Sequence, residues 1–162
     1  MTTTSLPIFD KTLQTTHRWL DEIMEVVGPD RHLAWHVLSA VLHALRDRLP
    51  METAAHLGSQ LPVPVRGLYY DQWHPAEVPE KLRTREAFLA RLGAELRKAR
   101  PLNLTDAAQA VFQVPCNHLD KGQLVKVRNA LPKGLRALWP KNCIAVARDQ
   151  RRAQGDGTHH SQ

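Results

Sequence analysis

Apolar residues recur every three or four positions along most of the chain, which is the spacing of amphipathic helices. A stripe of this kind begins after Pro7 and consists of Phe9, Leu13, Thr16, Leu20, Ile23 and Val27. Gly28 and Pro29 end this helix, and Asp30 is placed to cap the next one by accepting hydrogen bonds from its free N–H groups. No segment shows sustained strand-like alternation of apolar and polar residues. The pattern predicts an all-α fold.

A second helix is predicted from Arg31 to Leu49, and apolar residues cover more than half of its circumference. Such a wide apolar arc needs neighbours on several sides, so we expect this helix to be central. Pro50 and Pro62 bracket a third helix. Three later helices are each expected to start at an N-cap residue. The first of them is expected to carry a further stripe of buried apolar residues. The caps are Thr84, Asn103 and Asp120, and the stripe is Phe88, Leu89, Leu92 and Leu96.

Pro115 interrupts the helix expected to begin at Asn103. A proline in a helix interior removes one hydrogen bond and costs about 3 kcal/mol, so we expect it to kink or split this helix.

The stretch from Ala40 to Tyr70 aligns without a gap on the stretch from Ala110 to Pro140, seventy positions later. Unrelated chains would share about two identical pairs over this length. The identical pairs here are Ala40/Ala110, Val41/Val111, Leu49/Leu119, Leu61/Leu131, Pro62/Pro132, Arg66/Arg136 and Leu68/Leu138. This repeat predicts two tandem similar helical lobes in one compact bundle, each with about three helices and a short return helix, related by an approximate two-fold or screw axis.

The repeat also sets the expected boundaries. They are a flexible N-terminus (1–6), helical lobe 1 (7–70), a connector (71–83), helical lobe 2 (84–140) and a basic, partly disordered C-terminal tail (141–162).

The stretches LRDRLP, METAAHLGSQLP and VRGLYYDQW, between Leu45 and Trp73, carry a family likeness. Together with the connector and the second copy they resemble an uncharacterised bacterial family, the domain-of-unknown-function family numbered twenty-two sixty-seven. The resemblance covers Phe9 to Pro140 and implies a small, soluble, helical bacterial protein with two repeats. It implies no activity, substrate or catalytic residue. The second copy departs from the pattern at VPCNHLDKG.

Composition narrows the class of protein further. The chain has 162 residues, 43% of them apolar, which is enough for a sizeable core. It shows neither a membrane-spanning run nor a secretory signal, so we expect a cytoplasmic protein without membrane association. Cys116 and Cys143 do not make a disulfide framework, and we expect them to be buried or free thiols.

Positive charge is concentrated in the second half. Residues 1–96 hold ten Lys and Arg against twelve Asp and Glu, whereas residues 97–162 hold twelve against four. A basic half suggests an anionic partner such as nucleic acid, or serves solubility alone. The residues proposed for nucleic-acid contact are Arg97, Lys98, Lys126, Arg128, Lys133, Lys141, Arg151 and Arg152.

A row of histidines follows the polar face of the predicted central helix. His32, His36 and His43 share this face, and the His-x₃-His spacing suits zinc or iron. The structural alternative is a solvated polar face beside Asp47. If the row instead faces another helix or subunit, it would make a pH-sensitive contact.

Arg66 and Arg136 each lie four residues past a helix-stopping proline, Pro62 or Pro132. We expect them to be structural, bonding the carbonyls at a helix end or pairing with an acid such as Asp47.

Neither a nucleophile–base pair nor a phosphate-binding loop is recognisable, so we do not expect an enzyme. The leading hypothesis is a non-enzymatic binding or scaffolding module for an unidentified protein partner, with no cofactor. Nucleic-acid association and metal binding are the alternatives, and the oligomeric state is left open.

Overall fold

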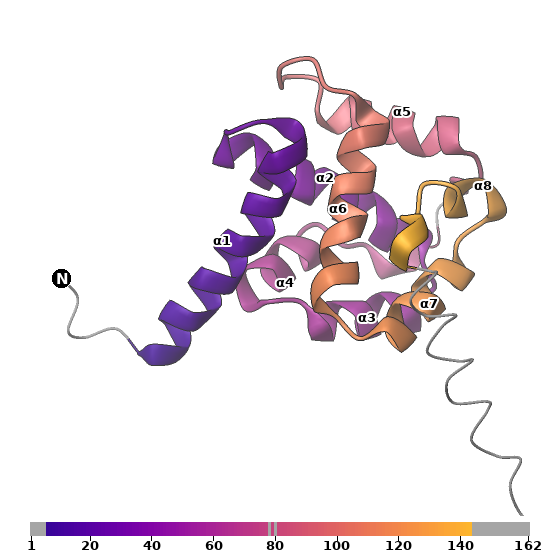
Figure 1. The fold of residues 1–162 in the computed structure, drawn as a ribbon. Coiled ribbons are helices and arrows are strands. Elements are labelled where there is room, and N and C mark those ends of the chain that lie inside the picture. Colours follow the sequence, from indigo (N-terminus) through magenta and orange to yellow (C-terminus); the bar gives the residue numbers. More distant parts are fainter. Residues whose placement is uncertain (1–5, 78, 80, 144–162) are drawn as a thin grey trace, which may run out of the picture.

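A computed structural model describes residues 6–77, 79 and 81–143 (Figure 1). None of these residues forms a strand, so the all-α prediction is confirmed. None of the helices in the described ranges is long and apolar enough to cross a membrane. In chain order the elements are α1 (Pro7–Val27), α2 (Arg31–Arg48), α3 (Met51–Gln60), α4 (Val63–Tyr70), the 3-10 helix η1 (Pro75–Glu77), α5 (Arg85–Glu95), α6 (Leu104–His118), α7 (Lys121–Ala130) and α8 (Lys133–Arg136).

The helices start where the sequence places their caps. The side chain of Asp30 accepts a hydrogen bond from the backbone N–H of Leu33 at 3.2 Å. Equivalent side-chain caps open three later helices, at Thr84 before α5, Asn103 before α6 and Asp120 before α7. Each satisfies an N–H group that a helix start would otherwise leave without a partner.

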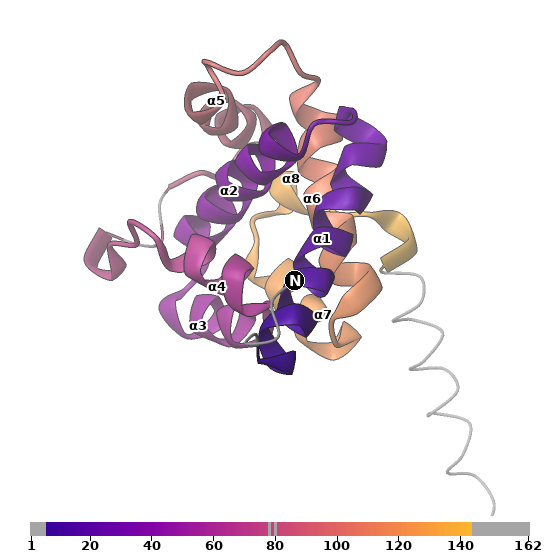
Figure 2. The same ribbon diagram turned by 90° about the vertical axis from the view of Figure 1, so that its left-hand side faces the viewer.

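α2 is the central helix, as its wide apolar arc predicts. It contacts α1, α4, α5 and α6, and α1 also packs along α6 (Figures 1 and 2). α3 lies against α7, so both halves of the chain contribute to one continuous core. Fully buried side chains from both halves, such as Leu38 of α2 and Leu92 of α5, belong to it.

One pair of helices and one pair of arginines follow the spacing of the proposed internal repeat, which itself stays a prediction. α7 begins and ends seventy positions after α3. Arg66 donates to the carbonyls of Ser59 and Leu61, at 3.0 and 3.1 Å. Arg136 donates to the two carbonyls seventy positions later, at 3.1 and 2.9 Å. Both arginines therefore bond carbonyls at a helix end rather than Asp47, and a purely structural role stays a prediction. The symmetry relation between the two lobes stays a prediction.

Of the two outcomes expected at Pro115, a split does not occur, and a kink stays a prediction. α6 continues through it to His118, and the carbonyl of Pro115 accepts from the N–H of Leu119 at 2.7 Å. The proline lies only one turn from the end, so its missing N–H removes one hydrogen bond close to where the ladder stops. Its burial, with that of Val114 and Cys116, favours the continuous helix.

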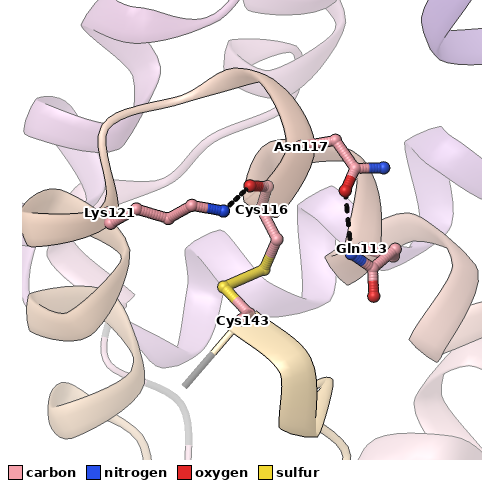
Figure 3. The surroundings of a disulfide bond; sticks show 5 residues. All are labelled: Gln113, Cys116, Asn117, Lys121 and Cys143. Atoms are coloured by element: carbon pink, nitrogen blue, oxygen red, sulfur yellow. Dashed lines mark hydrogen bonds between the residues drawn. A yellow bond between two sulfur atoms is a disulfide. The ribbon is translucent and has the colours of Figure 1, made fainter. Parts of the chain in front are cut away.

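The two cysteines form a disulfide, so the expectation of free thiols is wrong. Cys116 in α6 and Cys143 after α8 are both buried, and their Cα atoms are 5.5 Å apart (Figure 3). Lys121 at the start of α7 donates to the backbone carbonyl of Cys116. The bond ties the segment after α8 to α6. A 27-residue separation in sequence could not indicate this proximity.

Candidate functional site

The first two turns of α1 project beyond the other helices (Figure 1). Phe9 and Leu13 continue the apolar stripe that includes Leu20 and Ile23, yet they are 55% and 50% exposed. The prediction that they belong to a buried seam is therefore wrong. At 1.5 Å per residue, the segment from Leu6 to Leu13 is about 12 Å long. We call this segment the α1 overhang; it carries an apolar face that the described residues leave exposed.

A groove of about 510 Å³ runs beside the α1 overhang. α1 forms one wall, and the turn between α3 and α4 forms the other; the end of α6 also lines the groove. Ile8 on the first wall is 67% exposed, and Val63 on the second is 64% exposed. Apolar side chains this exposed on facing walls suit an apolar segment of another molecule.

The charges in the groove have one sign. Lys11 and Arg18 of α1 line it together with Arg66 of α4, and no aspartate or glutamate is among its lining residues in the described part of the chain. Glu22 is close by but is already engaged, because it pairs with His118 and accepts from Asn117. The groove therefore suits a ligand that is both apolar and anionic.

Two buried N–H donors lie in the groove walls. Neither Trp19 Nε1 nor Arg66 Nε has a hydrogen-bond partner among the described residues. The Trp19 ring stacks on His118, with ring centroids 5.9 Å apart. A buried donor without an acceptor costs about 1–3 kcal/mol, so both are unusual features of a folded protein.

A second hollow, of about 700 Å³, lies between α2, α5 and the segment around η1. It is polar, and several of its charged groups pair with one another. Asp47 accepts from Arg46 at 2.8 Å and from Arg91 at 2.6 Å. Burial acts to raise the pKa of Asp47, but the hydrogen bonds from the two arginines lower it below its ordinary value. Gln72 on its rim has a φ of 57°, a conformation that costs a residue other than glycine about 1–3 kcal/mol.

His43 bridges two elements from inside this polar hollow. Its Nδ1 lies 3.2 Å from Glu95 Oε1 on α5, and its Nε2 lies 2.7 Å from the Leu68 carbonyl oxygen on α4. The Glu95 hydrogen bond raises the pKa of His43, and it outweighs burial, which would lower it. With both ring nitrogens engaged, the imidazole is not placed to take a proton from a substrate or to bind a metal ion.

The histidine row is divided by the fold. His32 and His36 are exposed on the first half of α2, whereas His43 and Asp47 are buried, so the solvated-face interpretation is wrong for its second half. No group of three or more His, Cys, Asp or Glu that could hold a metal ion occurs among the described residues. The contact of His43 with α5 has the geometry of the pH-sensitive alternative.

The basic residues proposed for nucleic-acid contact are dispersed. One pair follows α5 and another lies on α7, and Figures 1 and 2 show these two helices at opposite ends of the molecule. In chain order the set comprises Arg97 and Lys98 after α5, Lys126 and Arg128 on α7, Lys133 on α8, Lys141 after it, and Arg151 and Arg152 outside the described residues. The two pairs therefore do not form one basic surface.

Sequence patterns did not identify the groove, because Ile8 and Val63 are ordinary apolar residues until the fold leaves them exposed.

Residues 16–138 match a family described as an uncharacterized conserved protein (DUF2267). The matched segment starts at Thr16, where the buried part of α1 begins, and it excludes the α1 overhang. A search of curated proteins found no match.

Proposed function

Because the chain belongs to the DUF2267 family of uncharacterized conserved proteins, whose description assigns no activity, we propose from the geometry that it is a non-enzymatic binding module that holds a protein partner in the groove beside α1.

One observation carries this proposal: strongly exposed apolar side chains line the groove. Ile8 on α1 is 67% exposed and Val63 on α4 is 64% exposed, and both line it. Burial of an apolar side chain stabilises a complex by about 25 cal/mol per Å² removed from water. A partner that covers these residues gains that energy, and contiguous exposed apolar patches typically mark interaction sites.

Other features favour binding over catalysis. The cysteines are joined in a disulfide, so neither supplies a thiolate nucleophile. Both ring nitrogens of His43 are hydrogen-bonded, and the buried Asp47 is paired with two arginines. The contacts of His43 and Asp47 hold α2, α4 and α5 together, which is a structural role.

The alternatives have less support. Nucleic-acid binding remains a second proposal, but the separation of its basic residues between α5 and α7 does not favour it. Metal binding would need a free ring nitrogen on His43, but one nitrogen bonds Glu95 and the other bonds the Leu68 carbonyl. We therefore propose no zinc or iron site. Bacterial origin and a cytoplasmic location stay predictions. The disulfide counts against the cytoplasm, where thiols are mostly kept reduced.

The test compares charge insertions inside and outside the groove. Ile8→Glu and Val63→Glu place a carboxylate on its two walls, and Val26→Glu is the matched control because Val26 is 54% exposed on the same helix but does not line the groove. All three side chains are exposed, so the variants should unfold at the temperature of the wild type.

Each tagged protein is used to capture proteins from an extract of its own host, and captured proteins are quantified by mass spectrometry. We expect at least one protein that the wild type and Val26→Glu retain and that both groove variants lose. If all four baits retain the same proteins equally, this function of the groove is refuted.

A further inference from the structure

The sign of the charges in the groove identifies the chemistry of its occupant. Lys11 and Arg18 are seven residues apart on α1, so they lie on one side of that helix. Arg66 stands on the facing wall, where its hydrogen bonds to two backbone carbonyls hold the guanidinium in place. A guanidinium that is already positioned loses less side-chain entropy on meeting a carboxylate.

The terminal segments of this chain have the wrong charge to occupy the groove. Residues 1–5 contain no acid, and residues 144–162 contain three arginines against two aspartates. A second copy placed on a two-fold axis would set the same cations against each other, because such an interface joins identical patches. Charge complementarity therefore points to a different protein.

The shape of the site favours a helix. Along α1 the groove is lined by Ile8, Thr12 and Thr15, which share one face of the helix, and one helix face packs well against another helix. The hollow beside it has two walls, with Ile8 and Val63 as apolar contacts, which is how grooves bind an amphipathic helix.

We infer that the groove binds an acidic amphipathic helix of another protein. Its apolar residues cover Ile8 and Val63, and its flanking carboxylates meet Lys11, Arg18 and Arg66. This inference rests on the proposed binding function and adds the chemical class of the partner.

The test is a displayed library of helical peptides with Leu, Ile, Phe or Met at the apolar positions and Glu, Gln or Lys at the flanking positions. The full-length protein selects binders, and Ile8→Glu is used for counter-selection. We expect glutamate to be enriched among peptides that require Ile8.

The selected peptides are then measured by fluorescence anisotropy. Lys11→Gln and Arg18→Gln should each weaken binding about two- to fivefold, the usual effect of one solvent-exposed ion pair, and less at high salt. The matched control is Lys98→Gln, which removes an exposed cation outside the groove and should leave affinity unchanged.

The outcomes separate this inference from the proposed function. Selected peptides that require Ile8 but are rich in Gln or Lys would overturn the acidic partner and leave the binding function standing. A library that yields no peptide dependent on Ile8 would overturn both. Two further results would overturn the inference: Ile8-dependent binding to phosphatidylglycerol vesicles without peptide binding, and an Ile8-dependent dimer in sedimentation.

Discussion

Glu95→Gln should remove a pH-dependent part of the protein's stability near neutral pH. In the folded protein, His43 Nε2 lies 2.7 Å from the Leu68 carbonyl oxygen, which can only accept, so Nε2 carries a proton in either charge state. Nδ1 faces the Glu95 carboxylate at 3.2 Å. When His43 is charged, Nδ1–H donates to that carboxylate. When His43 is neutral, a nitrogen lone pair faces it instead.

The magnitude follows from burial. A hydrogen bond between charged groups contributes about 1.5–3 kcal/mol when it is shielded from water. The His43 side chain is 9% exposed, but that of Glu95 is 31% exposed, so we reduce the expected contribution to about 1–1.5 kcal/mol. For a protein of this size that corresponds to about 2–6 °C in melting temperature.

The sign is set by the direction of the two pKa shifts. The pKa of His43 is raised, so its contribution is fully present below about pH 6.5 and is lost as the pH rises through the folded-state pKa. The pKa of Glu95 is lowered by the His43 hydrogen bond, so its contribution is fully present above its unfolded-state pKa and is lost as the pH falls through its folded-state pKa. Arg46 lies near His43 and acts in the opposite direction on it. The pair therefore stabilises the fold most between about pH 5 and 6.5.

Urea unfolding of wild type and Glu95→Gln between about pH 5.5 and 8.5 measures this effect. The wild type should be more stable by about 1–1.5 kcal/mol at the acidic end, and the difference should shrink as the pH rises. His32→Gln is the control, because His32 is exposed on the same helix, and it should keep the wild-type pH dependence. A constant difference between wild type and Glu95→Gln across this range would refute the reasoning.

Two further predictions concern the disulfide and a strained residue. Replacing Cys116 and Cys143 with alanine should lower the free energy of unfolding by about 3.5 kcal/mol, because the disulfide joins residues 27 positions apart. Urea unfolding with and without reductant checks this. A wild-type protein whose stability does not change with reductant would contradict it. Gln72→Gly should raise stability by about 0.5–1 kcal/mol by removing backbone strain at a φ of 57°, whereas Gln72→Ala should not. Thermal unfolding compares the two variants. A lower stability of the glycine variant would mean that contacts of the Gln72 side chain outweigh the strain.

The features that sequence predicted correctly depend on nearby residues. Asp30 caps α2 by reaching the N–H of Leu33, three positions away, and Asp120 reaches Gln123 in the same way. The role of Arg66 was equally accessible, because the carbonyls that it bonds lie five and seven residues earlier. Interactions over such spans are set by helix geometry, which the residue pattern encodes.

The candidate groove and the fate of the histidines could not be predicted in this way. Periodicity identifies Phe9 and Leu13 as apolar positions of one helix face, but not how far the neighbouring helices extend along it. His43 lies on the same face of α2 as His36, seven residues later, yet only His43 is covered, by a helix whose Glu95 comes 52 positions after His43.

The sequence by itself determined the all-helical class, most helix boundaries and the matched arginines, because each depends on residues within one or two helical turns. Tertiary structure alone decided that the α1 overhang stays exposed, that Cys116 meets Cys143, and that the charges of the groove share one sign. The physical reason is that exposure and pairing depend on which helices come together in space. Local spacing sets the face of each helix, whereas packing of the whole chain sets what covers that face.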